Sequence, residues 1–242
     1  MEFKVNKANI AEVSADAVVL PANERLKETA GVSGDVFKAA GRKKLQQTCD
    51  EIGYCGVGGA VPTLAYGLDA NYIIHAVIPT WTDGNHGEYD LLARAYLSAL
   101  KSADIMGCES LAIPLLASER EGFDRERAIT LAIKSIEGFF GKNLKKIALI
   151  IRENQTENDT RISGYTILTY TKENGTNRKT VDHREKTKIM IGSTKKITRS
   201  FLTDQAKKAG AWFLAKENRG KIIQCVIRTA AVLCNKKSDN TR

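Results

Sequence analysis

The feature that most constrains the fold is a regular alternation of short apolar runs and longer amphipathic segments over residues 1–151. The apolar runs are typical of buried strands and cover residues 17–20, 71–78, 111–113 and 146–151. The amphipathic segments repeat apolar residues at helical spacing and cover residues 33–40, 91–106 and 125–140. Strands that alternate with helices of this length pair in parallel and are covered on both faces. The sequence therefore predicts an α/β fold: a three-layer α/β/α sandwich with a mixed, mostly parallel central sheet.

The charge balance changes near residue 155, which indicates a second structural unit. Residues 1–154 carry 18 Lys and Arg against 20 Asp and Glu, whereas residues 155–242 carry 19 against 8. A wholly polar stretch at 153–160 separates the two parts. We therefore predict a domain at 1–154, a linker at 155–163, a small basic α+β domain at 164–234 and a flexible tail at 235–242.

The basic part has a pattern of its own. It predicts strands at 165–170, 188–191 and 221–233, a turn at 173–176 and an amphipathic helix at 201–216. Nine Lys and Arg lie within residues 172–199, and such clustering suits an acidic partner, either nucleic acid or an acidic protein. A solvated basic face without a partner is the alternative.

Composition argues against several classes of protein. No apolar run approaches the roughly 20 residues that cross a membrane, and the polar residues within 1–9 do not form a signal peptide. We therefore expect a cytoplasmic protein with no membrane partner. The five cysteines are scattered and have no histidine at metal-ligand spacing, so neither a metal site nor a disulfide framework is expected. They are Cys49, Cys55, Cys108, Cys225 and Cys234.

Five sequence blocks occur in unbroken order between residues 1 and 152. The first is 13–23, where Asp16-Ala17 precedes a strand that ends in Pro21-Ala22-Asn23; the others are 26–41, 58–68, 73–81 and 113–123. In their order and spacing these blocks resemble the macrodomain family, whose members bind ADP-ribose. The resemblance implies ADP-ribose as the ligand and requires no cofactor.

The resemblance also implies a role for individual residues. Asp16 would accept a hydrogen bond from the adenine amine, and Asn23 would bind the proximal ribose. Backbone N–H groups that follow Gly31 would bind the diphosphate at a helix N-terminus, and a second loop at 117–123 would clamp it. The implied ligand contacts are Asp16, Ala17, Asn23, Gly31, Val32 and Ser33, then Ala117, Ser118, Glu119, Arg120, Glu121, Gly122 and Phe123.

Each implied contact has a structural alternative. Asp16 could be a cap and Asn23 a turn residue. His75 lies within an apolar strand, so we interpret it as a core residue. Trp81 and Tyr96 are also expected in the core rather than at the ligand.

The chain departs from the family pattern at positions that matter for chemistry. Ser33 stands where the family's hydrolases have a catalytic aspartate, and we expect it to cap the helix instead. Asn23 is then the remaining candidate catalytic residue. Glu119 replaces a glycine and Glu121 replaces an aromatic residue in the second loop, and both carboxylates would repel a diphosphate.

Three functions are compatible with this sequence. The favoured one is a module that recognises free or macromolecule-linked ADP-ribose. The second is an ADP-ribosyl hydrolase or O-acetyl-ADP-ribose deacetylase with a weakened catalytic set. The third is a degenerate macrodomain that acts as a nucleic-acid or protein adaptor through residues 172–199.

Overall fold

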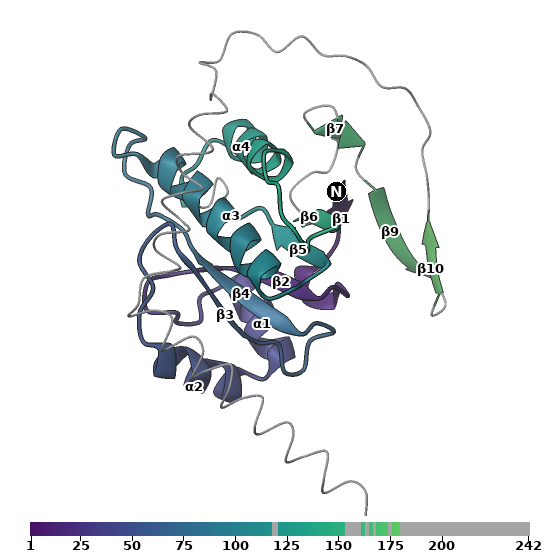
Figure 1. The fold of residues 1–242 in the computed structure, drawn as a ribbon, viewed down its shortest axis with the longest axis horizontal. Helices are drawn as coiled ribbons and strands as arrows, with labels where there is room; N and C mark the ends of the chain where they lie inside the picture. Colours follow the sequence, from purple (N-terminus) through teal and green to yellow (C-terminus); the bar gives the residue numbers. More distant parts are fainter. Residues whose placement is uncertain (118–120, 153–160, 163–164, 167, 174–175, 180–242) are drawn as a thin grey trace, which may run out of the picture.

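The computed structural model describes residues 1–117 and 121–152, together with 161–162, 165–166, 168–173 and 176–179 (Figure 1). The first strands and helices are β1 (Glu2–Lys7), the 3-10 helix η1 (Ile10–Glu12), β2 (Ala17–Ala22), α1 (Val32–Ala40), α2 (Arg42–Ile52), β3 (Ala60–Leu64) and β4 (Tyr72–Val77). The next are α3 (Glu88–Ile105), β5 (Ser110–Pro114), α4 (Arg125–Glu137) and β6 (Lys146–Ile151). Four short strands follow: β7 (Arg161–Ile162), β8 (Tyr165–Thr166), β9 (Leu168–Glu173) and β10 (Thr176–Lys179).

The central sheet is mixed and mostly parallel, as the sequence predicts. Its strand order is β10-β9-β1-β6-β5-β2-β4-β3. The five neighbouring strands β1, β6, β5, β2 and β4 pair in parallel, whereas β3 pairs antiparallel with β4. The carboxyl ends of those five strands consequently lie along one edge of the sheet.

Helices cover both faces of this sheet, with α3 and α4 on one side and α1 and α2 on the other (Figure 1). Alternate residues of β2 serve the two layers, since successive strand side chains point to opposite faces. Val19 packs in the α3–α4 layer, while Val18 and Leu20 pack in the α1–α2 layer. All three are essentially inaccessible to solvent. The predicted three-layer sandwich is confirmed.

Some elements were not predicted from the sequence. Strand β1 and helix α2 have weak apolar patterns because each is buried along a limited stripe, whereas β3 is largely buried but short, with Pro62 and Thr63 among its five residues. In α2 the buried side chains are Leu45, Thr48, Cys49 and Ile52 in an otherwise polar sequence. In β1 only Val5 is fully buried. For β1 and α2, the contacts with neighbouring elements identify the strand and the helix, because their own sequences are mostly polar.

The described part of the basic segment adds strands to the sheet. β9 pairs in parallel with β1 through Asn6 opposite Leu168 and Lys7 opposite Thr169. β10 returns antiparallel to β9 with Thr176 opposite Glu173, in agreement with the turn predicted at 173–176. The strands predicted at 188–191 and 221–233, the helix at 201–216 and the tail at 235–242 lie outside the described residues. The proposed division into domains and the partner of residues 172–199 remain predictions.

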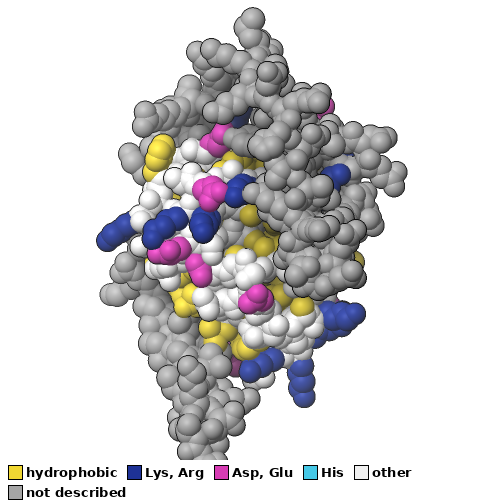
Figure 2. Space-filling view, turned by 90° about the vertical axis from the view of Figure 1, so that its right-hand side faces the viewer, with side chains coloured by type: hydrophobic (Ala, Val, Ile, Leu, Met, Phe, Trp, Pro, Cys, Tyr) yellow, Lys and Arg dark blue, Asp and Glu magenta, His cyan; other side chains and the backbone are white. Residues whose placement is uncertain are grey.

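Charges on the described surface are of both signs. Figure 2 shows basic and acidic side chains interspersed over the described part of one face, with apolar side chains between them. This distribution agrees with the small net charge of residues 1–154. Within the ranges that the structure describes, no helix combines the length and the apolar character needed to cross a membrane.

The loop that precedes α3 is organised by the buried carboxylate of Glu88. Its Oε1 accepts the backbone N–H groups of Thr82, Asp83 and Gly84 at 3.2–3.3 Å, and its Oε2 accepts that of His86 at 2.8 Å. Burial alone would raise the pKa of Glu88, but the backbone N–H donors outweigh burial and lower it to about 2. The loop is therefore held by an ionised carboxylate.

We predict that Glu88→Gln lowers the melting temperature at pH 7, because an amide oxygen and an NH2 group cannot accept the same four N–H donors. In the wild type this stabilisation is complete above the ordinary glutamate pKa of 4.5 and is lost as pH falls through about 2. The difference in melting temperature between wild type and variant should therefore shrink between pH 5 and pH 2, measured by circular dichroism. Glu126→Gln, which replaces an exposed carboxylate in the first turn of α4, is the control. A difference that stays constant with pH would contradict this role.

Candidate ligand-binding site

A cavity of about 720 Å³ lies at the edge of the sheet where the parallel strands end. Its size is within the range of small-molecule sites in proteins. The lining residues are Ala8 and Ile10 beyond β1, 21–23 at the end of β2, 29–33 at the start of α1, 78–81 beyond β4, 114–116 at the end of β5, Glu121, and Ile150 and Arg152 at the end of β6. Binding at this edge is the usual arrangement in open α/β sheets.

The N-terminus of α1 faces this cavity. Gly31 is its N-cap residue, with φ 78° and ψ −132°, a conformation that favours glycine, and no side chain caps the helix among the described residues. The first N–H groups of a helix carry partial positive charge and lack intrahelical acceptors. Gly31, Val32 and Ser33 all line the cavity. The structure therefore places these three predicted residues together, in an arrangement suited to an anion.

Ser33 is not the cap that the sequence suggests. α1 begins at Val32, so Ser33 lies inside the first turn, and its buried hydroxyl accepts the N–H of Thr29 at 3.1 Å. The helix starts earlier than expected because Gly31 supplies the turn by its backbone alone. Ser33 thus closes the loop on the N-terminal side of α1.

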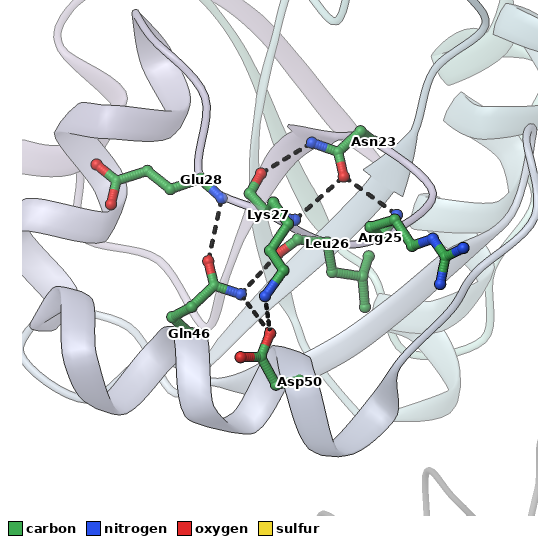
Figure 3. A network of polar contacts seen from close by, with 7 residues as sticks. All are labelled: Asn23, Arg25, Leu26, Lys27, Glu28, Gln46 and Asp50. Carbon is green, nitrogen blue, oxygen red and sulfur yellow. Dashed lines mark hydrogen bonds and ion pairs between the residues drawn. The ribbon is translucent and has the colours of Figure 1, made fainter.

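Asn23 also lines the cavity, but its amide is used within its own turn (Figure 3). Its Oδ1 accepts the N–H groups of Arg25 and Lys27 at 3.1 Å each, and its Nδ2 donates to the carbonyl of Lys27 at 2.9 Å. Such side-chain-to-backbone bonds are those of a turn-forming asparagine. The geometry favours the structural alternative for this side chain, which shapes a turn at the wall of the cavity.

The same turn is fastened to α2 through Gln46 (Figure 3). Gln46 accepts the N–H of Glu28 at 3.1 Å and donates to the carbonyl of Leu26 at 3.4 Å and to Asp50 at 2.8 Å. Lys27 reaches the same Asp50 carboxylate at 2.6 Å. Leu26 has a positive φ of 55° and is buried, so packing offsets the strain of a left-handed conformation. The segment 26–28, which leads to Gly31, is therefore held by polar contacts with α2 and by the burial of Leu26 in the core.

Asp16 and Ala17, which the resemblance implies as ligand contacts, lie at the opposite edge of the sheet from the cavity. They stand at the amino end of β2, whereas the cavity is at its carboxyl end, roughly 17 Å away for a six-residue strand. Asp16 accepts the N–H groups of Glu109 and Ser110 and the hydroxyl of Ser110, each at 2.9 Å. Burial opposes ionisation, but these bonds prevail and lower the pKa of Asp16. Asp16 thus caps the backbone N–H groups of Glu109 and Ser110, which agrees with the structural alternative given for it from the sequence.

The second predicted loop reaches the cavity only in part. Glu121 lines the cavity, while Ser118, Glu119 and Arg120 lie outside the described residues. Ala117 and Phe123 are buried and absent from the lining. Of the two carboxylates expected in this loop, Glu121 therefore lies at the cavity.

Gly122 and Phe123 support the wall of the cavity through Trp81. Gly122 has φ 88°, and a Cβ added there would lie 2.7 Å from the Trp81 ring, so only glycine fits. The Phe123 ring packs edge-on against Trp81 and Tyr89, with ring centroids 4.8 and 5.6 Å apart. Both residues therefore support the wall of the cavity, and their ligand contacts stay a prediction. Trp81 itself both packs against the core and lines the cavity.

Two other aromatic groups behave as the sequence suggests. His75 is fully buried, its Nε2 lies 3.0 Å from the hydroxyl of Thr63, and burial lowers the pKa of its imidazole to about 4. The hydroxyl of Tyr96, also fully buried, accepts the N–H of Leu116 at 2.9 Å. Both are core residues, as predicted.

One cluster of metal-ligand type lies in the loop before α3. The potential ligand atoms of Asp83, His86 and Glu88 come within 4.8 Å of one another. The Glu88 oxygens are already occupied by four backbone N–H groups, and Asp83 pairs with His86 at 3.0 Å. This donor set is committed to the loop rather than arranged for a cation.

Sequence reasoning missed one side of the cavity. Ala8, Ile10, Ile150 and Arg152 follow or end β1 and β6, and β1 was not recognised as a strand. The available signal was the end of the apolar run at 146–151, because residues just beyond a parallel strand meet the ligand edge. Arg152 also forms an ion pair with Asp35 of α1.

Comparison with known proteins identifies the family. The Macro domain family model matches residues 19–132. A macro domain-containing protein of Caldanaerobacter subterraneus is 36% identical over 154 residues, which cover 62% of this chain and 88% of that protein. An O-acetyl-ADP-ribose deacetylase of Pantoea vagans is 40% identical over 146 residues, or 59% and 85% of the two chains.

Solved structures agree in fold. The macro domain of ganglioside-induced differentiation-associated protein 2 superposes with a TM-score of 0.60 at 23% identity, covering 64% of this chain and 78% of that one. A macrodomain of Oceanobacillus iheyensis solved with ADP gives a TM-score of 0.57 at 24% identity, covering 61% and 81%. The strand order, the edge cavity and these matches lead to one conclusion: the chain belongs to the macro domain family.

Proposed function

We propose that this protein binds ADP-ribose, free or attached to a macromolecule, in the cavity at the carboxyl edge of the sheet. The observation that carries the proposal is the cavity's position over the N-terminus of α1, where Gly31 presents backbone N–H groups. Relatives support the ligand class: macrodomains of Oceanobacillus iheyensis and Trypanosoma brucei were solved with ADP. In this arrangement the diphosphate lies at the start of α1.

The rest of the lining suits the two ends of such a ligand. Toward β1 and β6 the wall has the apolar side chains of Ala8, Ile10 and Ile150, with Arg152 beside them. Toward β4 it is formed by Ile78, Pro79 and Trp81, among others. Apolar side chains on both sides of the α1 N-terminus suit a diphosphate that links two less polar groups.

Hydrolysis of O-acetyl-ADP-ribose is a second candidate, because relatives from Pantoea vagans and Escherichia fergusonii carry the name of that deacetylase. Two features of this chain favour binding over turnover. Ser33 offers a hydroxyl already used by Thr29, and the Asn23 amide is used by its turn. Glu121, the one carboxylate among the described lining residues, is the remaining candidate acid or base.

We predict that calorimetric titration of the full chain gives a Kd for ADP-ribose on the order of 10 μM. Gly31→Ala should weaken binding by about tenfold or more, because a Cβ is strained at this φ and displaces the N–H groups of α1. Gly107→Ala is the matched control: its φ of 76° imposes similar strain, it follows α3 outside the cavity, and it should keep wild-type affinity. Absence of binding at millimolar ADP-ribose would overturn the proposed function.

Asp16→Asn tests which edge of the sheet holds the ligand. We expect unchanged ADP-ribose affinity, with a lower melting temperature because two backbone N–H groups lose a charged acceptor. Titration and thermal melting of the same preparation separate the two effects. If a folded Asp16→Asn protein loses ADP-ribose binding, the ligand lies at the amino end of β2, and the proposed site at its carboxyl end is wrong.

We expect no turnover of O-acetyl-ADP-ribose above the rate in buffer, measured by chromatography under single-turnover conditions. The physical reason is that the described lining offers no acid or base other than Glu121. Turnover that disappears in Glu121→Gln but persists in Ser33→Ala would replace the binding proposal with the deacetylase.

A further inference from the structure

We propose that Arg152 selects ligands by their negative charge and that Asp35 holds and moderates this arginine. The inference rests on the proposed function, because it names the counter-ion of an anionic ligand in the same cavity. Arg152 follows β6 directly and lines the cavity, and its Nη2 donates to Oδ2 of Asp35 on α1. The ion pair therefore links the end of a central strand to the helix that faces the ligand.

The pair lies close to the anion-binding end of α1. Asp35 is the fourth residue of the helix, and its N–H donates to the carbonyl of Gly31 at 3.1 Å. One helical turn is about 5.4 Å long, so Asp35 is within one turn of the N–H groups beside Gly31. The ion pair with Asp35 therefore draws the Arg152 guanidinium toward the end of α1 at which the diphosphate is proposed to bind.

The charge balance of the cavity indicates why Arg152 matters for binding an anion. Among the described lining residues it is the one cation and Glu121 the one acid. A diphosphate adds negative charge to a cavity that already contains a carboxylate, and repulsion between like charges must be offset for it to bind. Helix N–H groups supply only partial charge, whereas a guanidinium supplies a full one and binds phosphate oxygens in a bidentate manner.

The pair is exposed enough to exchange partners. The Arg152 and Asp35 side chains are 40% and 37% exposed, and ion pairs at this exposure are weak. An incoming phosphate can therefore draw the guanidinium from Asp35 or share it. Asp35 positions Arg152 when the cavity is free, and it competes with the ligand once the ligand arrives.

The test uses full-length wild type and four variants, titrated calorimetrically with ADP-ribose, ADP and adenosine at several salt concentrations. Arg152→Gln removes the charge, Arg152→Lys keeps it, and Asp35→Asn removes the competitor. Lys145→Gln is the matched control: it removes one cation at the other end of β6, where Lys145 pairs with Glu109 at 2.5 Å. Thermal melting establishes that each variant is folded.

We expect Arg152→Gln to bind ADP-ribose and ADP about tenfold more weakly, with a shallower salt dependence and unchanged adenosine binding. Arg152→Lys should stay within about threefold of wild type, and Asp35→Asn should bind about threefold more tightly, since it removes a nearby like charge. Lys145→Gln should match wild type in affinity and salt dependence.

Two results overturn the inference while leaving the proposed function intact. One is wild-type ADP-ribose affinity in Arg152→Gln, and the other is an equal loss for adenosine and ADP-ribose, which would indicate a contact independent of charge. A wild-type protein that binds none of the three ligands overturns the proposed function and this inference together.

Discussion

Parallel pairing of β1, β6, β5, β2 and β4 is the constraint on which the site depends. Because these strands run in one direction, the residues that follow each of them meet at one edge, although they lie up to 144 positions apart between Ala8 and Arg152. Burial on both faces favours this direction, because the two helical layers cover apolar side chains on both faces of the central strands. The cavity is thus a consequence of the sheet rather than of any single loop.

Within this frame, the loop between β2 and α1 is held before a ligand arrives. Asn23 shapes its first turn, Gln46 ties its middle to α2, and Ser33 accepts an N–H from its last residues. Leu26 anchors it in the core at a strained φ. Preorganisation of this kind reduces the entropy that binding would otherwise cost. Side chains that looked like candidates for chemistry are committed to this support, which is why binding is favoured over catalysis.

The charges that line the cavity then determine which ligands it favours. The partial positive charge of α1 attracts any anion, while Glu121 opposes it and Arg152 is shared with Asp35. The described cavity therefore balances attraction and repulsion closely. Small changes in one charged group are able to shift its ligand preference, because the lining holds no excess of either sign.

Local pattern in the sequence determined the layered α/β fold, the buried strands, and the core roles of His75 and Tyr96. These features follow from hydrophobic periodicity. Resemblance in five ordered blocks determined the family. Each of these signals is contained in a short stretch of chain.

Only the tertiary structure decided which polar residues meet the cavity. Asp16 precedes a strand and Asn23 follows it, so the two lie at opposite edges although they are seven positions apart. Arg152 and Asp35 pair across 117 positions, and α2 and β1 are recognisable through what covers them. The physical reason is that strand direction and pairing are long-range properties: they depend on burial of distant segments against one another, which no local stretch of sequence encodes.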